Sequence, residues 1–409
     1  MQDDLQNFTT ERHFDHRVIK TPRIILNMKK AILILALIMS ALFSTNAQTD
    51  ESYLPRKIDL VIGTYGEHLY IYNLDCQTLE FTPKAQTEAK NPSYALEGLG
   101  YIFAVSELGE GSGAYSFQVT KGAEMSVQMT ADRRQTGADP CFAIVYTEPY
   151  IGPHLMTADY SGGSVSVFPI RNGQIGERVE QICFEGSGPV EGRQESPHIH
   201  QLKAVPNVDG YILASDLGAD VIRLLKTGKG EGTADQPGTL ELEHVKDIEC
   251  PAGSGPRHME FSEDGKMLYC IAELSGEVLA YKVSGKKKPS FKLVQRIQAD
   301  EVNAGGSADI HMHPSGQWLY TSHRLENDGI SIFKVLKDGK LEKIGYAHTG
   351  RHPRNFMITP DGKLLLVACR DDRSLQMFRI EPDGTLTQTP STLTFSEDMP
   401  SSVIELKAN

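Results

Sequence analysis

The sequence predicts an all-β fold, a seven-bladed β-propeller whose seventh blade is closed by N- and C-terminal strands. Three observations predict it. Short runs rich in β-branched and aromatic residues alternate with Gly and Asp turns. These runs repeat with a period of roughly 45–59 residues, the size of a four-stranded propeller blade. The two ends of the chain carry incomplete, complementary copies of the repeat.

Residues 28–47 match a secretory signal peptide. Two lysines follow Met28, an apolar run occupies 31–43, and Ala47 supplies the small residue of a cleavage site. The run is shorter than the roughly 20 apolar residues of a membrane-spanning helix. We therefore expect cleavage after Ala47, a propeller domain at 48–409, no membrane span afterwards, and a periplasmic or secreted protein. The alternatives are an uncleaved anchor, or a cytoplasmic protein if the segment is not processed; residues 1–27 are expected to be a patternless upstream segment.

The mature part begins with three strand-like runs, at 58–62, 69–72 and 79–83, with no inner strand before them. Six complete units follow, beginning near Pro92, Pro140, Pro197, Arg257, Asp309 and Arg354. A final run at 399–404 supplies an inner strand with nothing after it. Joining the two ends completes a seventh blade and leaves no unpaired sheet edge. No long segment shows the 3.6-residue apolar spacing of a helix.

Composition excludes some classes of protein. Lys and Arg number 41 against 53 Asp and Glu, a net charge of −12, which argues against nucleic-acid binding. The six cysteines show no C-x-x-C spacing, so we expect no zinc motif and no obligatory disulfide framework. Cys270 and Cys369 lie inside apolar runs and are expected to be buried thiols.

Ionisable residues recur where the first and second strands of each unit should meet. Because neighbouring strands are antiparallel, the beginning of an inner strand and the end of the second strand lie at the same mouth of the central channel. The second-strand ends are Thr64, Glu107, Asp159, Asp216, Glu273, Arg324 and Arg370, and the inner-strand beginnings are His198, His200, Arg257, His258, Asp309, His311 and Arg354. Such a ring suits binding and acid–base chemistry on an anion.

Structural roles stay open for several of these residues. Glu107, Asp159 and Asp216 could cap turns, and Arg257, Arg324 and Arg354 could form a purely structural cluster with Glu273. The pairs His198/His200 and His311/His313 have the spacing of metal ligands on one face of a strand, but no carboxylate pattern accompanies them. We therefore predict no metal. No phosphate-binding Gly-rich loop or dinucleotide fingerprint is visible in the sequence, so no cofactor is expected.

The chain resembles the seven-bladed propeller lactonases, which include the bacterial 6-phosphogluconolactonase type and are related to carboxymuconate-lactonising cycloisomerases. The resemblance covers nearly the whole mature chain. The stretches that carry it are IGTY at 62–65, DYSGGSVSV at 159–167, RQESPHIH at 193–200, GSGPRH at 253–258 with Glu273-Leu274, ADIH at 308–311 and PRNF at 353–356.

The resemblance implies hydrolysis of a sugar lactone, with 6-phosphogluconolactone as the foremost candidate. It implies a catalytic set of a histidine (His198 or His200), Arg257, Glu273 and Arg324. We take His198 as catalytic and expect His200, His258, His311 and Arg354 to bind substrate. Glu273 or His198 would activate water, Arg257 would stabilise the oxyanion, and Arg324 with Arg354 would hold a phosphate or carboxylate. No G-x-S-x-G elbow is present, so no acyl-enzyme is expected.

Two other functions stay open at this point. The same ring could run the reverse ring closure of a lactonising cycloisomerase, or the propeller could be a non-catalytic binding protein of the cell envelope. The partner expected is a small anionic sugar lactone, with no nucleic acid, and the protein is expected to be a monomer or weak dimer.

Overall fold

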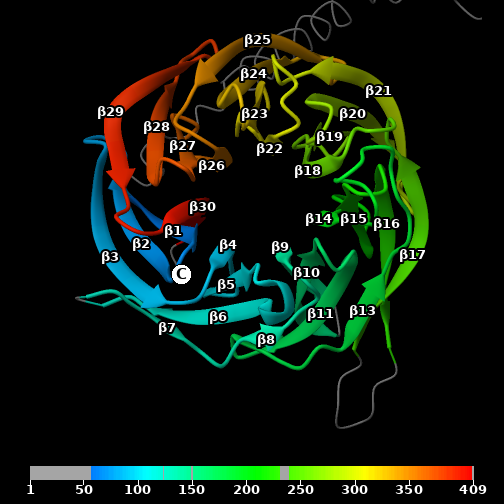
Figure 1. The fold of residues 1–409 in the computed structure, drawn as a ribbon, viewed down its shortest axis with the longest axis horizontal. Coiled ribbons are helices and arrows are strands. Elements are labelled where there is room, and N and C mark those ends of the chain that lie inside the picture. The colour runs from blue at the N-terminus through cyan, green and yellow to red at the C-terminus, as the bar shows by residue number, and fades with distance from the viewer. Residues whose placement is uncertain (1–56, 123, 149–150, 231–238, 408–409) are drawn as a thin grey trace, which may run out of the picture. The chain divides into compact units, whose positions relative to one another are not determined.

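Seven antiparallel sheets surround a central axis in the computed structural model, which describes residues 57–122, 124–148, 151–230 and 239–407 (Figure 1). The predicted seven-bladed β-propeller is therefore confirmed. The predicted signal peptide at 28–47 lies outside the described residues. Within the described part, the one helical element is a 3-10 turn, η2 (Gly109–Gly111), and no helix there is long and apolar enough to cross a membrane.

Six blades are continuous in sequence, and each takes its strands in order from the axis outwards (Figure 1). Blade 1 comprises β4 (Pro92–Gly98), β5 (Tyr101–Ser106), β6 (Gly113–Thr120), β7 (Ser126–Met129) and β8 (Arg134–Gln135). Blade 2 comprises β9 (Pro140–Glu148), β10 (Gly152–Asp159), β11 (Ser164–Arg171), β12 (Gln174–Ile175) and β13 (Glu180–Cys183). Blade 3 comprises β14 (Ile199–Ala204), β15 (Tyr211–Asp216), β16 (Val221–Lys229) and β17 (Leu240–Glu249).

The remaining continuous blades follow the same order. Blade 4 comprises β18 (Pro256–Phe261), β19 (Met267–Ala272), β20 (Glu277–Ser284) and β21 (Ser290–Gln298). Blade 5 comprises β22 (Ser307–Met312), β23 (Trp318–His323), β24 (Gly329–Val335) and β25 (Leu341–His348). Blade 6 comprises β26 (Pro353–Ile358), β27 (Leu364–Cys369), β28 (Ser374–Ile380) and β29 (Leu386–Thr394).

Blade 7 joins the two ends of the chain, as predicted. Its outer strands are β1 (Lys57–Tyr65), β2 (His68–Asp75) and β3 (Glu80–Glu88), and its inner strand is β30 (Met399–Leu406). β30 runs antiparallel to β1, with Val61 opposite Ile404 and Ile62 opposite Val403. The ladder ties the last described strand to the first described strand and closes the ring.

The second strand of each blade is almost continuously buried because both of its faces pack against neighbouring sheets. Every residue of β19 and of β27 is buried. The turn before β19 contains Gly265 at a φ of +68°, and the turn before β27 contains Gly362 at +69°. A left-handed backbone favours glycine there, which explains the Asp-Gly pairs seen in the sequence.

Every inner strand breaks its register with the second strand near the same end of the blade. A β-bulge of this kind leaves an extra residue out of the ladder and re-aims its side chain. The residues left out, here called the bulge ring, are Ser93, Cys141, His200, Arg257, Ala308 with Asp309, Arg354 and Ser401. Their convergence builds the site.

Candidate active site

Glu273 lies at the centre of a cluster of three arginines. It directly follows β19, and its carboxylate Oε2 lies 2.8 Å from Nε of Arg257 and 3.3 Å from Nη2 of Arg324. The Nε–H of Arg257 is not directed at this oxygen, so the contact is an ion pair rather than a hydrogen bond. On the other oxygen, Oε1, Glu273 accepts a 2.6 Å hydrogen bond from Nη2 of Arg193.

The three neighbouring arginines keep the Glu273 carboxylate ionised. Burial alone would raise the pKa of Glu273, but the positive charges of Arg324, Arg257 and Arg193 outweigh it and hold the pKa at about 2. Glu273 is therefore ionised at neutral pH and weakly basic. Burial lowers the pKa of Arg324 to about 9, which still leaves the guanidinium charged near neutrality.

Backbone carbonyls fix the two buried guanidiniums. Arg257 donates from Nη1 to the carbonyl of Ala308 at 2.6 Å, and Arg324 donates from Nε to that of Gly306 at 2.8 Å. Nη1 of Arg324 also donates to Nε2 of His352 at 3.4 Å. Since both carbonyls belong to blade 5, the segment leading into β22 holds arginines from two blades in place.

His198 is linked to this cluster through Tyr160, which interacts with Arg193, and one nitrogen of the His198 ring has a defined partner. Its Nδ1 is 3.0 Å from the carbonyl oxygen of Tyr160, which can only accept, so Nδ1 carries the proton. In the neutral imidazole, Nε2 then keeps its lone pair. The ring stacks on that of Tyr160 with centroids 4.3 Å apart, and the side chain is partly exposed. This is the arrangement of a histidine held ready to accept a proton.

Arg354 is part of a separate group. Its guanidinium lies over the ring of Tyr65, 5.0 Å from the centroid, and its Nη2 is 3.6 Å from Oε1 of Glu107. The hydroxyl of Tyr65 donates to the same carboxylate at 2.9 Å. Burial works against the charged form, but the negative groups around Arg354 raise its pKa. Glu107 thus balances Arg354 and does not cap a turn.

His258 and His311 share one carboxylate deeper along the inner strands. Nδ1 of His258 is 2.7 Å from Oδ1 of Asp309, and Nε2 of His311 is 2.9 Å from Oδ2. Asn355 donates to the same Oδ2 at 2.5 Å. Burial, with the charge of Arg257, lowers the pKa of His258 to about 4, so this ring is neutral.

His200 packs within the same layer. It is 4% exposed, its ring centroid lies 5.1 Å from that of His258, and its Nδ1 lies 3.6 Å from Sγ of Cys141. Burial, followed by the charge of Arg257, lowers the pKa of His200 well below its usual value. His200, His258 and His311 are thus brought together, but their polar contacts are with Asp309 and Cys141.

Four other residues of the predicted ring have local structural partners. Asp159 accepts hydrogen bonds from the hydroxyls of Thr157, Ser164 and Ser166 and is fully buried. Asp216 forms a 2.7 Å ion pair with Arg223 and accepts from the backbone N–H of His198.

The other two lie at strand ends. Thr64 donates to the carbonyl of His68, and Arg370 donates to its neighbour Asp371 at 2.7 Å. Asp216 also accepts from the backbone N–H of Ala219, so the turn-capping alternative describes Asp216. Asp159 is held by hydroxyls, and Thr64 and Arg370 are held locally.

The candidate metal pair His311/His313 is occupied by protein partners. His311 bonds to Asp309, and His313 contacts the hydroxyl of Ser315 and the carbonyl of Gly362. Over the described ranges, no group of three His, Cys, Asp or Glu side chains has the geometry of a metal site. All six cysteines are described and carry free thiols, with Cys270 and Cys369 fully buried as expected.

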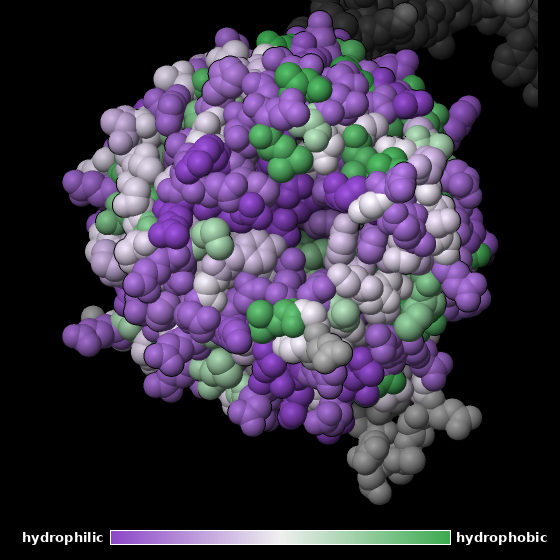
Figure 2. Space-filling model, viewed as in Figure 1, coloured by the Kyte–Doolittle hydropathy of each residue, from purple (hydrophilic) through white to green (hydrophobic). Residues whose placement is uncertain are grey.

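A small cavity of about 10 Å³ lies among five members of the bulge ring, which are Ser93, Cys141, Arg257, Arg354 and Ser401. That space holds about one water molecule. Hydrophilic side chains surround the central hollow of the face shown in Figure 2.

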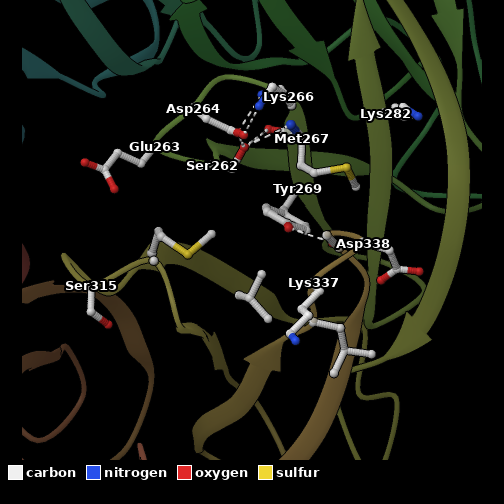
Figure 3. Close-up of a pocket in the computed structure, with 15 residues that line it drawn as sticks. Ser262, Glu263, Asp264, Lys266, Met267, Tyr269, Lys282, Ser315, Lys337 and Asp338 are labelled. Carbon is white, nitrogen blue, oxygen red and sulfur yellow. Dashed lines mark hydrogen bonds and ion pairs between the residues drawn. The ribbon is translucent and has the colours of Figure 1, made fainter. Parts of the chain in front are cut away.

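A larger cavity, of about 580 Å³, lies at the other end of the blades (Figure 3). The turn that holds Asp264 and Lys266 lines one side, and Lys337 with Asp338 lines the other. This turn precedes β19, whereas Glu273 follows it, so the strand separates the cavity from the arginine cluster.

Of the residues expected to be catalytic, Arg257 and Arg324 both contact Glu273, and His198 is linked to them through Tyr160 and Arg193. Arg354, expected to bind substrate, belongs to the Glu107 group. Sequence reasoning missed Arg193, which stands in the motif at 193–200 but outside any strand, and Tyr160. The only sequence signal for Arg193 was its place five residues before His198.

The chain is thus a seven-bladed propeller in which three arginines gather around one buried carboxylate. The family model of the seven-bladed β-propeller lactonases matches residues 59–403. The chain therefore belongs to this lactonase family.

Relatives named 6-phosphogluconolactonase support the assignment to this family. The 6-phosphogluconolactonase of Formosa agariphila is 37% identical over 248 residues, which cover 59% of this chain and 68% of the relative. That of Bacillus subtilis is 28% identical over 347 residues, covering 81% and 94%.

Solved structures with the same fold also support the assignment to the lactonase family. A Bacteroides fragilis protein provisionally identified as a 6-phosphogluconolactonase superposes with a TM-score of 0.75 at 35% identity, covering 88% of this chain and 99% of its own. A periplasmic gluconolactonase of Pseudomonas aeruginosa superposes with a TM-score of 0.75 at 26% identity, covering 85% and 99%.

Proposed function

We propose that this lactonase hydrolyses a sugar lactone at the channel mouth, with the Glu273 cluster as its catalytic centre. The observation that carries the proposal is the contact of three guanidiniums with one buried carboxylate. Three positive charges against one negative leave an excess that favours an anionic transition state. Opening a lactone passes through a tetrahedral oxyanion, which such a site would stabilise.

His198 is the proposed general base. Its Nδ1–H is held by the Tyr160 carbonyl, which leaves the lone pair on Nε2 available. Glu273, the alternative base, is held by three arginines at a pKa of about 2 and is too weakly basic to remove a proton from water near neutral pH. The role that fits Glu273 is to align Arg257 and Arg324.

Arg257 and Arg324 are the proposed oxyanion donors. Both are almost fully buried, and their carbonyl contacts fix them before substrate arrives. Donors placed in advance in a dry site contribute on the order of 3–4 kcal/mol each to transition-state stabilisation. The layer below the mouth would have a structural role. It contains His200, His258 and His311, whose polar contacts are with Asp309 and Cys141.

The reaction then proceeds in two proton transfers. His198 takes a proton from water as the hydroxide oxygen bonds to the lactone carbonyl carbon, and the charge moves to the carbonyl oxygen beside Arg257. When the tetrahedral intermediate collapses, the ring C–O bond breaks and the imidazolium returns its proton to the leaving oxygen. The products are a hydroxyl and a carboxylic acid, which ionises.

The names of the relatives favour hydrolysis over the two other functions considered. The Formosa agariphila and Bacillus subtilis proteins are 6-phosphogluconolactonases, and the Pseudomonas aeruginosa protein is a gluconolactonase. We therefore propose 6-phosphogluconolactone as the substrate, with gluconolactone as the unphosphorylated alternative.

The test compares the purified protein with spontaneous lactone opening. Gluconolactone and its 6-phosphate are added at pH 6–7 in weak buffer, and acid release is followed with an indicator. The proposal expects an enzymatic rate with at least one of them, and an Arg257→Gln variant that folds normally but has lost that rate. A wild-type protein that accelerates neither reaction would reject it.

We also propose that the chain is exported and acts in the cell envelope as a monomer or weak dimer. Support comes from the leader-like sequence at 28–47 and from the periplasmic location of the Pseudomonas aeruginosa protein. Sequencing the N-terminus of the native protein tests it, with a mature end at Gln48 expected. A protein that keeps its leader in the cytoplasm would contradict it. Sedimentation of the mature protein gives the oligomeric state.

A further inference from the structure

The mouth carries more positive than negative charge. Four guanidiniums gather there, those of Arg193, Arg257, Arg324 and Arg354, against the two carboxylates of Glu273 and Glu107. Four minus two leaves a surplus of two positive charges. Arg354 has a carboxylate of its own in Glu107, so the surplus belongs to the three arginines that share Glu273.

These three arginines differ in their access to solvent. The side chain of Arg257 is 2% exposed and that of Arg324 is 7%, whereas that of Arg193 is 37% exposed. A substituent that projects away from the lactone ring towards solvent would meet Arg193 first. Its contacts with Glu273 and Tyr160 leave further N–H donors among the five of the guanidinium, and the planar fork suits a phosphate or carboxylate.

Hydrogen bonds anchor the loop that carries Arg193, residues 184–198. Gln194, 1% exposed, donates from its side chain to the carbonyl of Leu217 at 2.8 Å and accepts from the N–H of Val190 at 3.1 Å. The backbone of Arg193 donates to the carbonyl of Val190 at 3.1 Å. Because these bonds order the loop before binding, little conformational entropy is lost when an anion is bound.

We propose that Arg193 binds the anionic substituent of the substrate and sets the preference for a phosphorylated over a neutral lactone. This inference rests on the proposed lactonase function and goes beyond it, because it moves anion recognition from Arg354 to a loop residue outside the blades. Arg193 keeps its contact with Glu273 in this role and bonds the substituent through its remaining donors.

The experiment compares Arg193→Gln and Arg193→Lys with a matched control, Arg296→Gln. Arg296 also bonds a glutamate, Glu277, at 2.8 Å, but it is 51% exposed and belongs to the outer strand β21. For each protein, kcat/KM is measured with 6-phosphogluconolactone and with gluconolactone, and the affinity for the product 6-phosphogluconate is measured by calorimetry. The product affinity reports binding of the phosphate group independently of catalytic turnover.

The expected result is a change in the ratio of the two substrates. In R193Q, kcat/KM falls about tenfold more for the phosphorylated lactone than for gluconolactone. The affinity for 6-phosphogluconate also falls about tenfold, as loss of a charge-assisted hydrogen bond predicts. R193K keeps part of the preference, and R296Q matches wild type.

Three results would overturn the inference: equal losses for both lactones, unchanged product affinity in R193Q, or a wild-type enzyme that opens gluconolactone with no preference for its phosphate ester. A wild-type protein that opens neither lactone would instead reject the proposed function itself, so the two failures are distinguishable.

Discussion

Arg257 and Glu273 meet within a single blade, with Nε of the arginine 2.8 Å from Oε2 of the carboxylate and only 2% and 9% of the two side chains exposed. Arg257 is the bulge residue of β18, and Glu273 follows β19, the strand beside it. The pairing of these two strands therefore sets the position of both groups, before any contact between blades is made.

Replacing the central carboxylate should cost both stability and activity. In Glu273→Gln, three guanidiniums remain close together without their counter-charge. Removing one member of a buried ion pair typically destabilises a protein by about 3–5 kcal/mol. We expect a loss of that size in urea unfolding and a partial recovery when phosphate is added to the mouth. Unfolding that matches wild type without phosphate would contradict this account of Glu273.

The free energy of unfolding should decrease at acidic pH because Glu273 becomes protonated. The pKa of Glu273 is about 2 in the folded protein against an ordinary value of 4.5. A carboxyl whose folded pKa is depressed stabilises the protein above the unfolded pKa and loses that contribution as pH falls from about 4.5 to 2. The contribution is about 3 kcal/mol, an order-of-magnitude figure.

Unfolding free energies of wild type and E273Q, measured between pH 6 and pH 2, test this. The difference between the two proteins should narrow as the pH falls through that window. A difference that stays constant would show that Glu273 does not titrate there.

His198→Asn should remove the proposed base and leave the fold intact. The side chain is partly exposed, so we expect a change in stability within about 0.5 kcal/mol. Loss of a general base lowers kcat by about 10²–10⁴-fold. Steady-state rates and thermal unfolding measure the two effects. Unchanged kcat in the variant would transfer the role of base to another group.

Closure of the ring should depend on β30. Val403 is 1% exposed and packs among residues of blades 6 and 7, including Leu60 and Met357. Ending the chain before Met399 would expose the edge of β1 and this apolar surface, so we expect aggregation and loss of cooperative unfolding. Lys407→Ala, at an exposed position just after β30, is the control. A soluble, cooperatively unfolding truncated protein would show that β30 is dispensable.

The blade repeat was predictable from sequence because it rests on local signals. Asp-Gly turns and apolar runs mark the second strands, and the incomplete ends at 58–83 and 399–404 indicate the shared blade. Antiparallel geometry placed Arg257, Glu273 and Arg324 among the ionisable residues of one mouth, and the family resemblance singled them out. Their direct contact is seen in the structure.

The finer layout depends on features with no regular period. In each inner strand, a bulge determines which residue is left out of the hydrogen-bonded ladder. In five blades that residue follows a proline, as in Pro256-Arg257 and Pro353-Arg354. This proline is a sequence signal that could have predicted the bulge. The pairing of Arg354 with Glu107 joins positions far apart in the sequence. Arg193 lies on a loop whose path is set by the long-range bond between Gln194 and Leu217.

A crystal structure with 6-phosphogluconate bound tests the central claim most directly. The claim predicts the product carboxylate within hydrogen-bond distance of Arg257 or Arg324, next to Nε2 of His198. Product bound in the cavity between Lys266 and Lys337, with the arginine mouth empty, would contradict it.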